Sequence, residues 1–109
     1  KIREVKGITD TEKQDIINFL QGAVYCWCKN RADEWFSLRN LMGGENFDWN
    51  GTPLLALYQK HINNGHNSDV SIEKAGKDAG WILKKVIKND SRIFDTDKKS
   101  LIRNYRWKK

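Results

Sequence analysis

The sequence is poor in several residues that mark particular classes of protein. Its two cysteines, Cys26 and Cys28, are too few and too close together for a disulfide framework, so we expect a reducing, cytoplasmic compartment. No apolar run comes near the ~20 residues that a membrane-spanning helix needs, and no membrane partner is expected. The charged stretch Lys1 to Ile8 has no signal-peptide core. Because the only methionine is Met42, we expect a fragment of a longer protein.

Aromatic residues, in contrast, are well represented. Five Trp, four Phe and three Tyr among 109 residues supply enough apolar volume for one core, although 31% of the residues are charged. A chain of this length suits one domain, predicted here as residues 9–109 after a mobile lead-in, residues 1–8. The abundance of Asn, Lys and Ile suits an AT-rich genome of bacterial or phage type.

Positive charge is concentrated in the last third of the chain. Residues 1–70 contain 8 basic and 9 acidic side chains, whereas residues 71–109 contain 12 basic and 5 acidic ones. The second segment therefore holds all of the formal net charge of +6. Such a segment attracts a polyanion, and nucleic acid is the commonest polyanion in a cytosol. A solvated lysine surface that keeps the protein soluble is the alternative interpretation.

Hydrophobic spacing and capping signals predict three helices, one short strand and a terminal hairpin. The first helix begins after Thr9, where Glu12 completes a capping box, and runs to about Asn30. The other expected elements, in chain order, are a strand at Glu34–Arg39, a helix from Thr52-Pro53 to Asn64-Gly65, a polar connector at His66–Val70, a third helix at Ile72–Asn89 capped by Ser71, and strands at Arg92–Thr96 and Leu101–Trp107 joined by a loop at Asp97–Ser100.

This order predicts a mainly α fold with a small β component, and it resembles the winged helix fold, a helix-turn-helix variant with a β-hairpin wing. The resemblance covers about 100 residues and rests on element order. It implies that the third helix enters the major groove of DNA and that the hairpin touches the backbone or the minor groove. One departure is the connector between the second and third helices, which is longer than usual.

The predicted third helix has a basic face opposite its apolar face. At 100° per residue, five lysines surround one tryptophan there. These residues are Lys74, Lys77, Trp81, Lys84, Lys85 and Lys88. The functional interpretation places the lysines on phosphates and Trp81 against a sugar, a thymine methyl or an unpaired base. The alternative is that Trp81 packs beneath the hairpin or the connector, covered by lysine stems.

The predicted hairpin adds further basic residues, namely Arg92, Lys98, Lys99, Arg103 and Arg106, with Lys108 and Lys109 after it. In the last strand, Arg103, Tyr105 and Trp107 share one face with Leu101, and Ile102, Asn104 and Arg106 share the other. Arginines beside Tyr and Trp suit a nucleic-acid edge. They equally suit a strand whose aromatics close the core while its arginines face water.

No residue pattern indicates catalysis, a metal or a cofactor. Cys26 and Cys28 lie about 200° apart on one helix, so they cannot both face a zinc ion with His61 and His66. Four acidic residues could suggest a nuclease, but they fall in loops and at a helix start. These residues are Glu45, Asp48, Asp69 and Glu73. Serine and cysteine nucleophiles lack recognisable partners, and Gly43-Gly44 is not a phosphate loop.

One loop carries a second hypothesis. Phe47 and Trp49 lie in a Gly- and Asn-rich segment, where two aromatics can anchor a partner protein. They can also fold back over the first helix as a plug.

These observations predict a non-enzymatic module that binds double-stranded DNA through phosphate contacts from the third helix and the basic hairpin. It would be a small transcription regulator or the recognition domain of a larger DNA-processing protein. The alternative is a protein interaction or dimerisation domain, because fold alone does not settle function. Binding of single-stranded or structured RNA would need Trp81, Tyr105 or Trp107 exposed for stacking.

Overall fold

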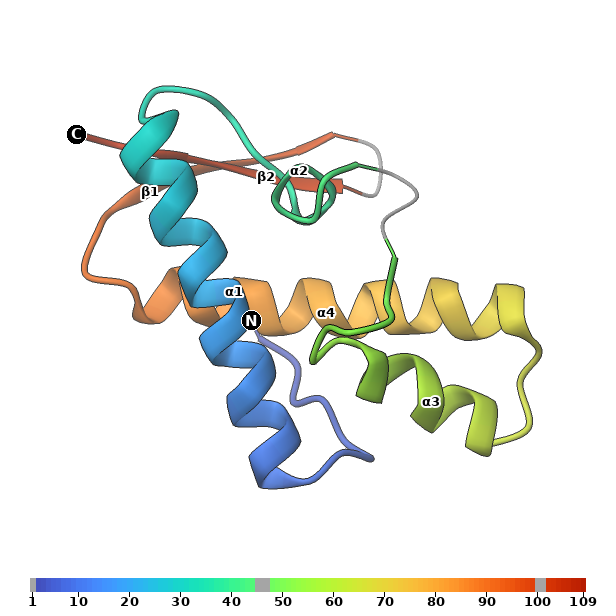
Figure 1. Ribbon diagram of the computed structural model, residues 1–109. Helices are drawn as coiled ribbons and strands as arrows, with labels where there is room; N and C mark the ends of the chain where they lie inside the picture. The colour runs from blue at the N-terminus through green and yellow to red at the C-terminus, as the bar shows by residue number, and fades with distance from the viewer. Residues whose placement is uncertain (1, 45–47, 100–101) are drawn as a thin grey trace.

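The computed structural model describes residues 2–44, 48–99 and 102–109. This part of the chain is mainly helical, with one small antiparallel sheet, as the sequence predicts (Figure 1). Its elements are α1 (Asp10–Asn30), α2 (Leu38–Leu41), α3 (Leu55–Asn63), α4 (Ser68–Asn89), β1 (Phe94–Lys99) and β2 (Ile102–Trp107). The three long helices are the three that were predicted, and α2 is a single additional turn.

Helix α1 begins and ends where its capping signals place it. The backbone N–H of Glu12 donates to the Thr9 hydroxyl at 3.0 Å, and the Glu12 carboxylate accepts from the Thr9 N–H at 2.8 Å. This capping box satisfies two of the N–H groups that a helix start leaves unpaired. The buried face of α1 carries Ile16, Leu20, Val24 and Cys28 at helical spacing.

The strand expected at Glu34–Arg39 is wrong. Only Phe36 pairs, in an antiparallel bridge to Tyr105 with both N–H···O distances at 2.8 Å. Ser37 then caps the short helix α2, accepting from the Asn40 N–H while the Asn40 side chain accepts from the Ser37 N–H. This local capping favours a helical turn over continued strand pairing after Phe36.

Two helix starts also differ from the prediction. Thr52 does not cap a helix at Pro53; its hydroxyl accepts from the Leu54 N–H within a turn, and α3 begins at Leu55. Helix α4 begins one turn earlier than expected, because the Asn67 side chain caps it by accepting from the Val70 N–H. The connector between α3 and α4 is therefore residues 64–67, one residue shorter than the connector predicted at residues 66–70.

The terminal hairpin has the predicted topology with shifted boundaries. Asp97 to Lys99, expected in the loop, belong to β1, while Ser100 and Leu101 lie outside the described residues. Thr96 pairs with Tyr105, so one face of the hairpin holds the residues at 94, 96, 98, 103, 105 and 107. This is the predicted face pattern of the last strand. Because Tyr105 on this face is only 4% exposed, this face of the hairpin packs against the core at that position.

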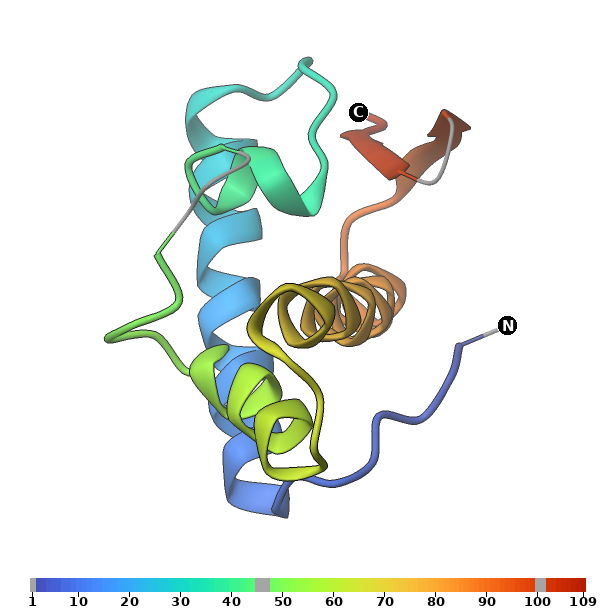
Figure 2. The same ribbon diagram turned by 90° about the vertical axis from the view of Figure 1, so that its right-hand side faces the viewer.

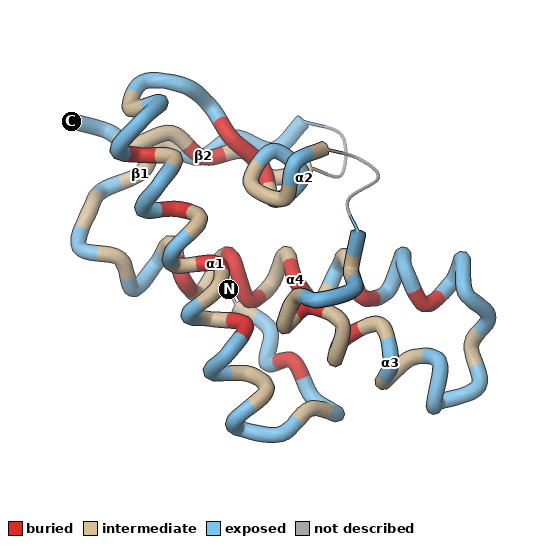
Figure 3. The backbone as a smooth tube through the Cα atoms, in the orientation of Figure 1, coloured by how far each residue is buried: buried red, intermediate tan, exposed pale blue. Residues whose placement is uncertain are grey.

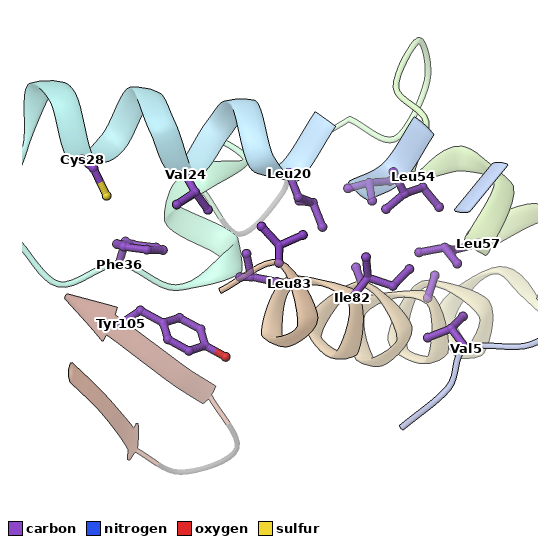
Figure 4. Close-up of a cluster of buried hydrophobic side chains, with 14 residues drawn as sticks. Val5, Leu20, Val24, Cys28, Phe36, Leu54, Leu57, Ile82, Leu83 and Tyr105 are labelled. Atoms are coloured by element: carbon purple, nitrogen blue, oxygen red, sulfur yellow. The ribbon is translucent and has the colours of Figure 1, made fainter. Parts of the chain in front are cut away.

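The core lies between α1, α3 and α4 and continues under the hairpin (Figure 3). Leu20 and Val24 of α1 face Leu83 of α4, and Phe36 lies between α1 and Tyr105 (Figure 4). The expected lead-in contributes to this core, because Val5 is buried at 6% exposure. Residues 2–8 are therefore packed against the helices by at least one apolar anchor.

The arrangement around α4 positions the candidate site. Figure 2 looks nearly along the α4 axis, with α1 on one side of α4 and the hairpin and lead-in on the other. Both α1 and α3 contact α4, and we call the side of α4 opposite its buried residues, where Lys74, Lys77 and Lys88 are exposed, the open side of α4. The candidate functional residues lie on this side.

Candidate nucleic-acid interface

Helix α4 has one buried face and one basic face. Its buried residues are Ser71, Ala75, Ala79, Ile82, Leu83 and Val86. Their mean direction points opposite to Lys77, Lys84 and Lys88 at 100° per residue. Lys74, Lys77 and Lys88 are exposed, whereas Lys84 and Lys85 are half-buried. The lysine face predicted from the sequence is therefore present on the surface of α4.

Trp81 is half-buried, and two cations cover its ring. The Arg3 guanidinium lies 5.6 Å from the ring centroid, and the Lys84 ammonium lies 5.2 Å from it. One of the two interpretations of the sequence predicted that the hairpin or the connector would cover the Trp81 ring. The cover comes instead from the lead-in and from a lysine of α4 itself. With two cations against its ring, Trp81 does not present a free platform for stacking on a base.

The lead-in adds basic residues that the sequence reasoning missed. Arg3 is exposed and lies beside Trp81 and Lys85, so it extends the basic face of α4; Lys6 is also exposed. Glu4, between them, is paired with Lys13 of α1, whose hydrogen bond and charge lower the pKa of the Glu4 carboxyl. Lys60 of α3 donates to the Lys6 carbonyl and fixes the backbone there. The lead-in is too short to show a hydrophobic period, so no signal in the sequence indicated this placement.

The central acidic residue of α4 is neutralised from α3. Asp78 accepts from Lys60 Nζ at 2.8 Å, and its contact with His61 Nε2 is also 2.8 Å. The carboxylate is 20% exposed and faces α3, not the lysine face. Its negative charge is therefore screened from an approaching polyanion.

Arg92 does not take the phosphate-contacting place that the sequence prediction gave it. Its guanidinium donates to both carboxylate oxygens of Asp90, at 3.0 and 2.8 Å, and its side chain is 17% exposed. The same guanidinium lies over the rings of Tyr25, at 5.2 Å, and Trp107, at 5.5 Å. These contacts make Arg92 a structural cation between α1 and the hairpin.

The other hairpin arginines are partly committed. Arg106 pairs with Asp95 at 3.1 Å and lies 4.6 Å from the centroid of the Trp35 ring. Arg103 donates to the Thr96 hydroxyl at 3.3 Å. Both remain half-buried on the sheet surface. Tyr105 of β2 is buried and closes the core, as predicted by the interpretation in which the aromatics of this strand pack inward.

The end of β1 carries the two fully exposed basic side chains of the hairpin. Lys98 and Lys99 follow each other and therefore point to opposite faces of the sheet. Neither forms an ion pair with a residue that the structure describes. They are the hairpin residues best placed to reach a polyanion beside α4.

The aromatic loop is seen only in part. Trp49 is half-buried and packs against the core, in agreement with the plug interpretation. Phe47 lies outside the described residues, as does Glu45.

Within the part of the chain that the structure describes, no three His, Cys, Asp or Glu side chains gather in a way that could hold a metal ion. Cys26 is exposed, whereas Cys28 is buried and burial raises the pKa of its thiol.

The comparisons with known proteins do not place this chain in a family: no family model, no curated protein and no solved structure matches it.

Across the described residues, none of the helices combines the length and the apolar character that crossing a bilayer requires.

Proposed function

We propose that this domain binds double-stranded DNA through the open side of α4, as a small regulator or as the recognition domain of a larger DNA-processing protein. The observation that supports the proposal is the placement of three basic elements on one side of the molecule. Figure 2 has the hairpin, α4 and the lead-in on the side away from α1. Lys77 and Lys88 of α4, Lys98 of the hairpin and Arg3 of the lead-in represent these elements.

Phosphate is the group that this surface fits. Lysine ammonium groups act as point charges, which suit phosphate oxygens, and each neutralised phosphate releases condensed counterions. Two acidic residues near the surface are paired with residues outside it, Glu4 with Lys13 and Asp78 with Lys60. Glu73 pairs with Lys77 of the surface itself at 3.5 Å, but their side chains are 71% and 69% exposed, so solvent weakens this pair and a phosphate can compete for the lysine. Basic side chains still outnumber acidic ones on this surface.

Fluorescence anisotropy of a labelled 20-base-pair duplex, titrated at several salt concentrations, tests this proposal. We expect binding that weakens steeply with salt, and weakens at least tenfold further in Lys77→Glu/Lys88→Glu. Lys29→Glu, at an exposed position on α1, is the control: it reverses one charge where the test variant reverses two, and it should weaken binding by no more than about threefold relative to the natural protein.

Two results would contradict the proposal. The first is the absence of duplex binding at low salt by protein whose circular dichroism is native. The second is a preference for a single strand of the same sequence, which would indicate stacking on the aromatics as the main interaction.

A further inference from the structure

The basic residues of α4 fall into two groups with a gap between them. Lys74 and Lys77 form the first group, and Lys84, Lys85 and Lys88 form the second. The centres of the two groups are separated by about 10 residues, or ~15 Å along the axis at ~1.5 Å per residue. The outward side of the gap holds Gly80 and Trp81 and no charged side chain.

This spacing suits the two phosphate strands that border one groove. The major groove of B-DNA is ~12 Å wide, and flexible lysine stems can cover the small remaining difference. A helix laid across the groove would place one lysine group on each bordering strand. Gly80 lies in the middle of the helix and has no side chain, so the helix is narrow at this point. An added Cβ would meet nothing within 4 Å.

From Ser68 to Lys88, the same helix lacks arginine, asparagine and glutamine, whose planar groups pair most specifically with base edges. Recognition helices of helix-turn-helix proteins contact base edges with their N-terminal residues. The first two turns of α4 instead expose two acidic residues, Asp69 and Glu73, and two apolar ones, Val70 and Ile72. Arg, Asn and Gln, which pair bidentately with bases, do not occur between Ser68 and Lys88. The one large side chain over the gap, Trp81, is covered by Arg3 and Lys84.

We infer that the domain binds duplex DNA independently of sequence, with α4 bridging the two phosphate strands that border one major groove. This inference rests on the proposed function and specifies its substrate class. The lysine groups supply affinity and register on the duplex.

Two measurements with the whole chain test the inference. In the first, anisotropy is measured on several unrelated 20-base-pair duplexes, and a randomised duplex pool is taken through rounds of selection. We expect dissociation constants within about threefold of each other and no enriched motif. An enriched motif, or a spread above about tenfold, would overturn the inference while leaving duplex binding itself intact. Absence of binding to every duplex would instead contradict the proposed function.

The second measurement maps the two strands. Uncharged methylphosphonate linkages are placed on one border of a single major groove, on the other border, or on both. Lys74→Gln/Lys77→Gln should lose its sensitivity to one border, and Lys84→Gln/Lys88→Gln should lose its sensitivity to the other. Lys29→Gln is the control and should remain sensitive to both. Equal sensitivity of all three variants to the same border would exclude the bridging geometry.

Discussion

The carboxylate of Asp90 and the guanidinium of Arg92 form a nearly buried ion pair just after the end of α4. Arg92 Nη1 donates to both carboxylate oxygens, and the Asp90 side chain is only 2% exposed. Asp90 also accepts from Gln21 of α1, at 2.7 Å, and from the Arg92 backbone N–H, at 2.8 Å. One carboxylate therefore joins α1, the end of α4 and the start of the hairpin.

Asp90→Ala should lower the free energy of unfolding by about 3 kcal/mol, because it leaves the Arg92 cation and the Gln21 amide without their partner in a poorly solvated site. Urea denaturation followed by circular dichroism measures the effect. Asp97→Ala, at an exposed position of β1, is the control and should change stability by less than about 0.5 kcal/mol. A similar loss in both variants would exclude a special role for the Asp90 carboxylate.

Gly80→Ala should raise the free energy of unfolding by about 0.5–1 kcal/mol, because glycine weakens a helix interior and alanine does not. A Cβ added at Gly80 or Gly76 meets nothing within 4 Å, so neither substitution creates a clash. Gly65 is the contrasting control: its φ of +92° is unfavourable for alanine, and Gly65→Ala should be destabilising. Thermal melts of the three variants measure the sign of each change.

The two cysteines should react at very different rates in the native protein. Cys26 is exposed, whereas Cys28 is 1% exposed and burial raises the pKa of its thiol, so little reactive thiolate forms there. A thiol-reactive chromophore at pH 8 should modify one thiol quickly, and Cys26→Ser should abolish that fast phase. Both thiols should react in denaturant. Fast modification of two thiols in the native protein would show that Cys28 is accessible.

Tyr105 should make the protein less stable at alkaline pH. Burial raises the pKa of its phenol above the usual ~10, because the folded state disfavours the phenolate. The resulting stabilisation is present below the unfolded pKa and is lost as the pH rises through the folded pKa. Tyr105→Phe should therefore lose less stability than the natural protein between pH 9 and pH 11. Tyr25→Phe, at a ring that is 54% exposed, should follow the natural protein.

The helices were predictable where the signals are local. Thr9 and Glu12 define the start of α1 because a capping box needs only four consecutive residues. The lysine face of α4 follows from helical spacing alone. The angles between residues on a helix do not depend on where the helix begins, so the misplaced start did not affect this prediction. The start itself was misplaced because Asn67 and Ser71 are equally good caps in isolation. Ser71 is buried in the fold, and tertiary packing decides between the two.

The candidate site was less predictable, since its members depend on contacts between distant segments. Arg92 was assigned to phosphate because it lies in a basic stretch, yet it pairs with Asp90, whose carboxylate also accepts a hydrogen bond from Gln21 of the distant α1. The lead-in has too few residues to show a period, so the burial of Val5 and the contact of Arg3 with Trp81 had no signal of their own.

The antiparallel bridge between Phe36 and Tyr105 has a consequence for the shape of the molecule. Together with the hydrogen bond from Gln21 to Asp90, it ties the hairpin to the first third of the chain, and each tie spans 69 residues. The angle between the hairpin and α4 is therefore set by α1 and the turn at residues 31–35, not by the short linker that joins them. Lengthening that turn would shift the hairpin relative to α4 and so open or close the proposed binding surface, which the turn meets through the contact of Trp35 with Arg106.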